Sequence, residues 1–133
     1  MDEQSRHERG LRLRMQMFGR EDVEKRMRAL GTLGEPLQKI INTDVYGDVW
    51  SRTALPPATK SLIMVGMMAA AGQPIELRVH LKGAIKNGCT EEQIQEVLLL
   101  VTFYCGIPAA NDAHRIAVEI LNERGSMEQQ RRP

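Results

Sequence analysis

Apolar positions recur at helical spacing through the middle of the chain, and proline and glycine divide that stretch into six segments. Prolines stand in the first turn of several segments and glycines follow their ends, which is the usual asymmetry of helix termini. None of the segments alternates convincingly with the two-residue period of a β-strand. The pattern therefore predicts an all-α fold with six helices, at about 21–30, 35–50, 57–71, 74–88, 90–106 and 108–124.

Two of the predicted helices carry more apolar residues than one face can hold. The segment 90–106 opens with a capping box, in which Thr90 and Gln93 satisfy free N–H groups of the first turn. Its main apolar stripe consists of Ile94, Val97, Leu98, Val101 and Cys105. Further apolar residues lie off this stripe, namely Leu99, Leu100, Phe103 and Tyr104. The segment 57–71 is apolar nearly all round from residue 62, and such a helix must be covered on every side, so we predict a tight homo-oligomer.

The two ends of the chain differ from this helical middle. Residues 1–19 are rich in arginine and glutamate, and the alternation of apolar residues from Leu11 to Met17 has no partner strand. This segment is predicted to be an N-terminal arm or solvated tail, and an arm that binds nucleic acid is the alternative. Residues 20–125 form the predicted helical domain, and residues 126–133 are expected to be a disordered C-terminal tail.

The bulk composition excludes several function classes. The 133 residues suit a single domain, and the net charge of +1 gives no reason to expect nucleic acid or an anionic membrane as a partner. The longest apolar run, residues 62–71, is too short to span a bilayer and fits a buried helix. The charged start of the chain lacks the apolar core of a signal peptide. We therefore expect a cytoplasmic protein that does not contact the membrane.

The two cysteines predict neither a metal site nor a redox centre. Cys89 and Cys105 lie 16 residues apart, without a Cys-x-x-Cys pair or a Cys/His cluster at metal-ligand spacing. Both are expected to be reduced thiols. Cys105 is predicted to be buried and inert in the apolar stripe, and Cys89 to lie at a turn.

His80 is the main candidate for chemistry in the segment 74–88. Glu76 precedes it by four residues, so both side chains lie on one helix face and can touch. The neighbouring apolar residues Leu77, Leu81 and Ala84 place His80 at the edge of the inward face. A carboxylate at this spacing favours the imidazolium and orients the ring, as general acid–base catalysis requires. A core histidine with a satisfied hydrogen bond is the alternative.

Four further residues are candidates for substrate binding. Arg52 follows Trp50 in a predicted loop, where a surface salt bridge is the alternative role. Arg78 lies two residues before His80 on the same helix and therefore points elsewhere. Asn111 lies near the N-terminus of the last predicted helix, whose N–H groups and dipole favour an anion or oxyanion.

Several of these residues lie in stretches that resemble the gamma-carboxymuconolactone decarboxylases, at 46–52, 59–62, 76–84, 87–94 and 104–110. The more specific are the Glu-Leu-Arg-x-His sequence ending at His80 and the Tyr-Cys-Gly-x-Pro-Ala sequence beginning at Tyr104. The resemblance covers residues 31–121. It implies an all-α fold, shared with alkylhydroperoxidase-type proteins, that assembles into ring-shaped homo-oligomers, commonly hexamers. It also implies an enzyme that needs no cofactor.

The sequence departs from the related enzymes in informative ways. The alkylhydroperoxidase branch carries a redox Cys-x-x-Cys four residues before a histidine. With His80 as that histidine, the cysteine positions are Gln73 and Glu76, so a thiol-dependent peroxidase would lose its electron source. Residues 50–55 read Trp-Ser-Arg-Thr-Ala-Leu where the decarboxylases usually have Trp-x-Arg-Pro-Gly-Leu. His114, expected to be a packing or interface residue, stands where they commonly have a non-ionisable one.

The resemblance implies that a lactone dicarboxylate, gamma-carboxymuconolactone or a close relative, is decarboxylated to an enol-lactone in the protocatechuate branch of aromatic catabolism. His80 is the expected proton donor and oxyanion partner, oriented by Glu76. Arg52 is expected to bind the carboxylate that stays, with Trp50 lining the pocket and Arg78 as the alternative cation. The remaining alternatives are another cofactor-free lactone or enolate enzyme, a thiol-dependent peroxidase and a non-catalytic assembly protein.

Overall fold

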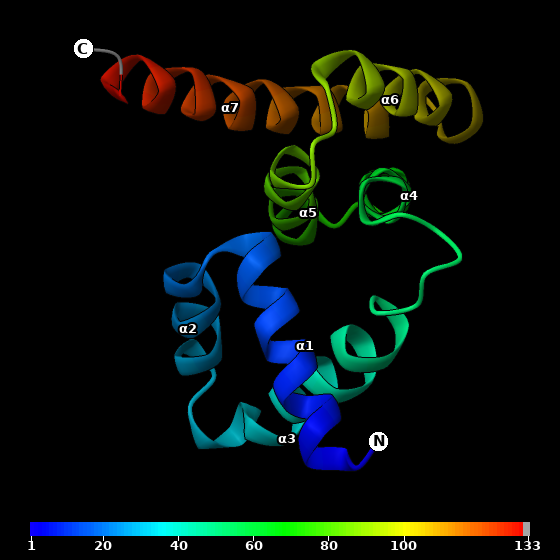
Figure 1. Cartoon of the computed structure of the whole chain (residues 1–133). Coiled ribbons are helices and arrows are strands. Elements are labelled where there is room, and N and C mark those ends of the chain that lie inside the picture. Colours follow the sequence, from blue (N-terminus) through cyan, green and yellow to red (C-terminus); the bar gives the residue numbers. More distant parts are fainter. Residues whose placement is uncertain (132–133) are drawn as a thin grey trace. The chain divides into compact units, whose positions relative to one another are not determined.

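The computed structural model describes the backbone of residues 1–131 and the side chains of residues 1–125. Within that part the chain is all-helical, as the sequence predicts, but it has seven α-helices rather than six (Figure 1). They are α1 (Glu3–Phe18), α2 (Arg20–Ala29), α3 (Glu35–Ile40), α4 (Pro57–Ala70), α5 (Pro74–Lys86), α6 (Glu91–Cys105) and α7 (Ile107–Arg131). A 3₁₀ turn, η1 (Thr32–Gly34), precedes α3, and a π-helical segment, η2 (Ile41–Val49), follows it.

The chain divides into two compact units, an N-terminal unit (Met1–Pro57) and a C-terminal unit (Ala58–Pro133). The N-terminal unit contains α1, α2, η1, α3 and η2, and the C-terminal unit contains α5, α6, α7 and nearly all of α4. The predicted helical domain, 20–125, takes in parts of both units, and its boundaries stay a prediction.

The helix that the sequence analysis did not predict is α1, in the segment 1–19 that was expected to be an arm or a solvated tail. Its buried residues are Gly10, Arg14, Met17 and Phe18. Their spacing of three and four residues is that of one helix face. The face is hidden from a search for apolar residues, because two of its four members are a glycine and an arginine.

Helix α1 packs against η2 at a crossing where the two backbones approach closely. A Cβ atom added at Gly10 would lie well under 3.0 Å from the carbonyl oxygen of Asn42 in η2. A Cβ atom added at Gly47 of η2 would similarly collide with the carbonyl oxygen of Arg6 in α1. The crossing therefore requires glycine on both sides, since glycine alone has no Cβ.

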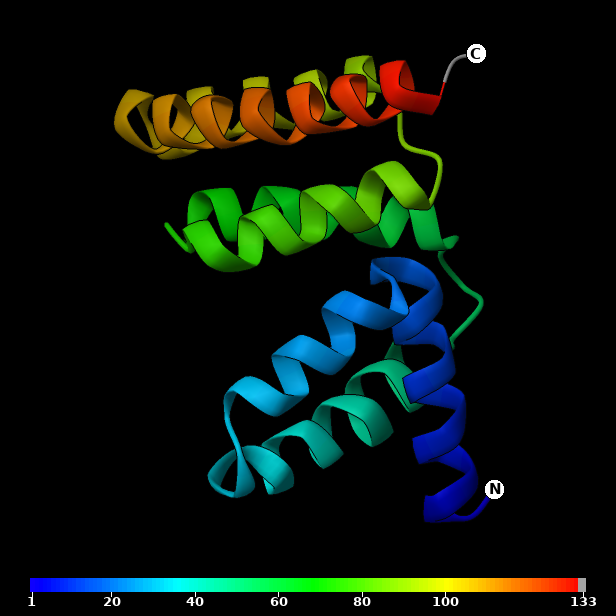
Figure 2. The ribbon, with the colours of Figure 1, turned by 90° about the vertical axis from the view of Figure 1, so that its left-hand side faces the viewer.

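The C-terminal unit has an apolar core to which all four of its helices contribute. Helix α7 packs along α6 and also contacts α5 (Figure 2). The buried members of the core are Val65, Ala69, Leu77, Leu81, Ala84, Cys89, Ile94, Leu98, Val101, Ala113, Ile116, Ala117 and Ile120. On α6 the predicted stripe is confirmed at Ile94, Leu98 and Val101. The capping box of Thr90 and Gln93 is confirmed as well, with both reciprocal hydrogen bonds present.

The prediction for the two cysteines is wrong in one respect. Cys105 is exposed, because it lies in the last turn of α6, one turn beyond Val101, the last buried residue of that helix. Cys89 is the buried thiol, and its Sγ–H donates to the carbonyl oxygen of Ala58 at 3.3 Å. Burial raises the pKa of the Cys89 thiol.

Helix α7 continues past residue 124, where the sequence pattern predicted its end. It includes the backbone of residues 126–131, which the sequence analysis assigned to a disordered tail. The rest of that predicted tail, residues 132–133, and the side chains of 126–131 lie outside the described residues. No helix within the described part is both long enough and apolar enough to cross a bilayer.

Candidate active site

The His80–Glu76 pair lies on α5 in the C-terminal unit. The buried face of this helix includes Leu77, Leu81 and Ala84, and His80 belongs to it rather than to its edge, since only 6% of the His80 side chain is exposed. Glu76, one turn earlier, is 57% exposed. Its Oε2 lies 3.9 Å from His80 Nε2, an ion-pair distance longer than a hydrogen bond. The predicted contact is therefore present, and it joins a buried imidazole to a carboxylate at the surface.

Arg78 and Asn111, two other predicted residues, lie in the same unit. Arg78 forms an ion pair with Glu119 of α7, so its guanidinium already faces a carboxylate. Asn111 is exposed and lines a cavity of about 420 Å³ on α7. His114 lines the same cavity, and its Nδ1 lies 2.7 Å from the carbonyl oxygen of Ala110. Because a carbonyl oxygen only accepts, Nδ1 is the donor there and the other ring nitrogen is left for other contacts.

Arg52 and Trp50 line one cavity of about 410 Å³ in the N-terminal unit, hereafter the arginine cavity. Its lining consists of Arg9, Arg12, Leu13, Gln16, Trp50, Ser51, Arg52, Thr53 and Pro57. The structure thus brings the two predicted residues together. It adds two arginines from α1 that the sequence analysis missed. Their helical spacing with Leu13 and Gln16 is the signal that would have identified this face, had the segment been taken for a helix.

The π-helical segment η2 positions the wall of this cavity. The N–H of Trp50 donates to the carbonyl of Val45 at 2.9 Å, which is the five-residue bond of a π-helix. The Ser51 hydroxyl donates to the carbonyl of Tyr46 at 2.8 Å, so the chain turns out of the helix with its polar groups paired. The Trp50 ring stacks on Tyr46, with 5.7 Å between centroids, and Tyr46 meets the edge of Phe18 of α1 at 5.8 Å.

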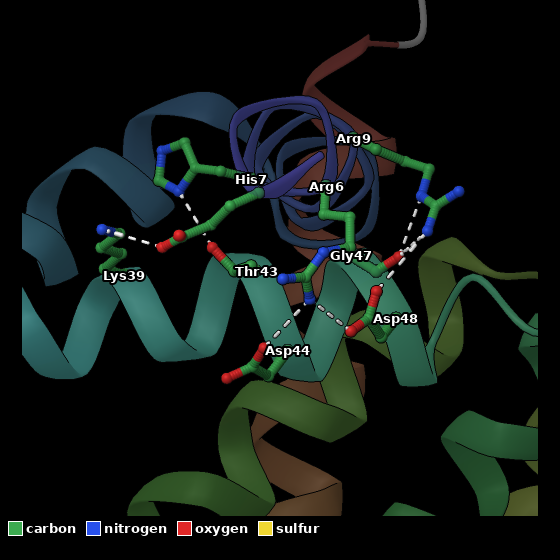
Figure 3. A network of polar contacts seen from close by, with 9 residues as sticks. Arg6, His7, Arg9, Lys39, Thr43, Asp44, Gly47 and Asp48 are labelled. Carbon is green, nitrogen blue, oxygen red and sulfur yellow. Dashed lines mark hydrogen bonds and ion pairs between the residues drawn. The ribbon is translucent and has the colours of Figure 1, made fainter. Parts of the chain in front are cut away.

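A network of charges ties α1 to η2 beside the arginine cavity (Figure 3). Arg6 binds Asp48 at 2.6 Å and Asp44 at 3.3 Å, and the hydrogen bond to Asp48 is the main reason that the pKa of Arg6 is raised. Arg9 donates through Nε to the carbonyl oxygen of Gly47 at 2.9 Å, and its Nη2 lies 3.7 Å from Asp48. The guanidinium of Arg9 is therefore held in place where it reaches the cavity.

Comparison with known proteins gives a consistent picture. The model of the Carboxymuconolactone decarboxylase family matches residues 36–119. A protein of Acinetobacter baylyi named 4-carboxymuconolactone decarboxylase is 33% identical over 125 residues, which are 94% of this chain and 93% of that protein. The Metarhizium robertsii protein named nitrosuccinic acid decarboxylase npaB is 32% identical over 124 residues, 93% of this chain and 87% of that protein.

The match to the Acinetobacter protein extends beyond the family model. An alignment that covers 125 of the 133 residues leaves out at most the first or the last eight, so it includes residues 9–125. All residues that line the arginine cavity fall within this range, together with Glu76 and His80. The family model begins only at residue 36 and therefore omits the part of α1 that contributes to the cavity.

Proposed function

We propose that this chain, which belongs to the carboxymuconolactone decarboxylase family and is a carboxy-lyase, decarboxylates gamma-carboxymuconolactone or a closely related lactone to an enol-lactone without a cofactor. The observation that carries the proposal is the buried His80 with Glu76 beside it on α5, inside the region matched by the family. The place of this reaction in the protocatechuate branch of aromatic catabolism is part of the same proposal.

The chemistry of such a substrate sets three requirements. Loss of CO₂ leaves an electron pair that flows through the ring double bond onto the lactone carbonyl oxygen. The enzyme must stabilise that oxygen as its charge grows, and it must return a proton to a ring carbon. It must also hold the second carboxylate, which stays on the substrate, near a cation.

His80 meets the first two requirements in this proposal. A buried imidazolium is a donor to the developing oxyanion and a source of the proton, and its interactions are strong because little water surrounds it. Glu76 favours the protonated ring and fixes which nitrogen faces it, so it acts as a positioning residue. The carboxylate itself is exposed, which leaves it in contact with the solvent that resupplies the proton.

Arg52 meets the third requirement as the cation for the retained carboxylate, with Trp50 as the apolar wall beside it. Arg78, which pairs with Glu119 of α7, is the alternative cation. Asn111, exposed on α7, is kept as a further polar contact of the substrate.

A homo-oligomer, of the hexameric ring type, completes the proposal. Leu100, Phe103 and Tyr104 of α6 and Ile107 of α7 are between 62% and 86% exposed in the single chain. Large apolar side chains gathered at the join of two helices favour burial against a further subunit. The same argument applies to Met67 of α4, which is 52% exposed.

A second candidate is decarboxylation of a nitro-substituted dicarboxylic acid. It is favoured by the match to the nitrosuccinic acid decarboxylase, which covers as much of the chain as the match to the lactone enzyme at nearly equal identity. In both substrates the electron pair left by CO₂ moves onto an electron-withdrawing group, a conjugated lactone carbonyl in one and a nitro group in the other. The same acid and anion-binding groups suit either reaction.

The test is a turnover assay with the purified full chain and no added cofactor. Gamma-carboxymuconolactone and nitrosuccinate are supplied separately, loss of substrate is followed by absorbance, and CO₂ release is measured in parallel. The His80→Ala variant gives the background of uncatalysed decarboxylation. Turnover of the lactone well above that background supports the main proposal, turnover of nitrosuccinate alone supports the second, and turnover of neither contradicts both.

A further inference from the structure

We infer that the arginine cavity is the recognition site for the two carboxylates that the substrate carries before it loses CO₂, and that Arg12 of α1 acts there together with Arg52. The inference rests on the proposed function for the identity of the ligand, a small dicarboxylate. It makes the N-terminal helix part of the substrate site and assigns its arginines to specificity rather than to the surface.

The sign of the charge sets this cavity apart. Its lining includes three arginines, and no acidic residue is among the described residues that line it. Three other cavities of similar size each combine an acidic and a basic residue, as with Glu35 and Lys39 in one of them. A chain with a net charge of only +1 thus gathers three positive charges around one hollow. The lining of this cavity therefore favours an anionic ligand over a cationic one.

The three arginines differ in what they do inside the unit. Arg9 donates to the carbonyl of Gly47 and pairs with Asp48, so part of its charge is neutralised by its neighbours. Arg12 follows three residues later on the same face of α1 and is exposed. Arg52 approaches from the segment after η2. We assign the direct contacts to Arg12 and Arg52, with Arg9 as a fixed positive charge behind them.

Two cations on separate elements recognise a ligand with two separated anionic groups. A monocarboxylate occupies one guanidinium at a time, whereas a di- or tricarboxylate bridges both and gains from each. The remaining lining includes Trp50, Leu13 and Pro57, which offer an apolar surface to a flat carbon skeleton. A volume of about 410 Å³ lies within the range that holds a small molecule.

The position of Trp50 supplies a direct readout of the cavity. It is the only tryptophan of the chain, so fluorescence excited at a wavelength that tyrosine does not absorb reports on this site. The full chain is titrated with tricarballylate, succinate and butyrate at constant ionic strength, because salt screens exposed charges. Calorimetric titration with the same three compounds measures the affinity independently of the fluorescence signal. We expect saturable binding of tricarballylate and succinate and at least about tenfold weaker binding of butyrate.

Two substitutions make the test specific. Arg12→Gln should weaken tricarballylate binding by about tenfold or more, since it removes one charge-assisted hydrogen bond. Arg20→Gln is the matched control, because it removes the same charge from the same unit. Arg20 pairs with Glu24 and is not among the residues that line the cavity, so the affinity of this variant for tricarballylate should match that of the wild type. Equal affinities for Arg12→Gln and wild type, or equal losses in both variants, would overturn the inference, as would butyrate binding as tightly as tricarballylate.

The binding test is separable from the test of the reaction. Carboxylate binding that depends on Arg12, in a protein that turns over neither acid, would support the cavity and contradict the proposed function. Turnover with a Michaelis constant unchanged in Arg12→Gln would support the function and contradict the assignment of the cavity.

Discussion

The interior of each unit is stabilised by a different kind of contact. The C-terminal unit has a continuous core made mostly of aliphatic side chains, and the buried ionisable residues among those described there are His80 and Cys89. In the N-terminal unit a whole guanidinium is buried, because Arg14 donates to Gln38 at 2.7 Å and to Asn42 at 3.0 Å. It also lies over the ring of Tyr46, 5.9 Å from its centroid.

Because of this difference, the two units should differ in the substitutions that they tolerate. Aliphatic contacts tolerate a change of side chain when the volume is kept. Buried polar groups tolerate little, since a donor or acceptor that loses its partner keeps the full cost of its desolvation. We therefore expect substitutions in the N-terminal unit to be costly when they disturb the geometry of hydrogen bonds. In the C-terminal unit we expect them to be costly when they change the volume of a side chain.

The largest effect is expected in the C-terminal unit at His80. His80→Ala should lower kcat by about 10²–10⁴-fold, because general acid–base catalysis and oxyanion stabilisation are worth that much. Glu76→Gln should lower kcat by a smaller factor, since Glu76 only orients the ring. Steady-state kinetics with matched oligomer size measure both. His7→Ala in the N-terminal unit is the control, and a kcat for His80→Ala above about one third of wild type would remove His80 from the mechanism.

The next effect concerns the glycine crossing of the N-terminal unit. Gly10→Ala should lower the free energy of unfolding by about 3 kcal/mol, because its Cβ collides with the backbone of η2, which cannot rotate away. Gly125→Ala in α7 is the matched control. None of the described residues has an atom within 4 Å of a Cβ there, so helix propensity should raise stability by up to about 1 kcal/mol. Urea denaturation of both variants measures the two changes in the free energy of unfolding. Similar changes in both variants would show that α1 and η2 do not approach closely at Gly10.

A smaller effect separates the two thiols of the C-terminal unit. Cys105 is exposed in the single chain and Cys89 is buried with a raised pKa, so in the separate subunit Cys105 should react with an aromatic disulfide reagent at least about tenfold faster at pH 8. The reaction is followed by absorbance, and Cys105→Ser should abolish the fast phase. Slow reaction of both thiols in the native protein would mean that a second subunit covers the end of α6.

The smallest effect is a loss of stability in the first turn of α1 at acid pH. Asp2 accepts a hydrogen bond from Ser5 N at 2.7 Å and Glu3 pairs with Lys39 at 2.9 Å, and these contacts lower the pKa of both carboxyls. Their stabilisation is complete above the unfolded pKa values, near 4. It disappears as the pH falls through the lowered folded values. NMR shifts of residues 3–6 between pH 5 and pH 2 would measure it.

A matched pair of variants checks the origin of that acid effect. Asp2→Asn keeps a capping oxygen but cannot titrate, and Glu3→Gln removes the charge that faces Lys39. The double variant should show a flat response between pH 5 and pH 2. An unchanged response would place the acid sensitivity elsewhere in the unit.

How much of the fold the sequence predicts depends on the unit. The C-terminal helices follow from aliphatic spacing, from Pro74 and from the cap at Thr90, because the core there is made of the residues that such a pattern counts. Helix α1 does not follow, because its buried face is partly glycine and arginine. The π-helical segment was predicted as part of one continuous helix at 35–50, since a wider turn leaves no mark in the spacing over nine residues.

The residues of the candidate site were also predictable only in part. The spacing of Glu76 and His80 predicts their contact on one helix, and the structure confirms it. The arginine cavity joins α1 to a segment about 40 residues later in the chain, and no local pattern predicts such a meeting. Arg9 and Arg12 were assigned to a solvated tail for that reason. Cys105 was misplaced because the stripe on α6 was continued one turn past the end of the core.

The π-helical form of η2 makes the length of this segment matter as much as its composition. A π-helix places one more residue in each turn than an α-helix does. Deleting a single residue from η2 would change the direction in which every later side chain leaves the helix, because each residue of an α-helix advances the chain by about 100° around the axis. Trp50 and Arg52 would then leave the face that they share with α1. The number of residues in η2 thus determines which side chains form the wall of the cavity, even when none of the lining residues is itself replaced.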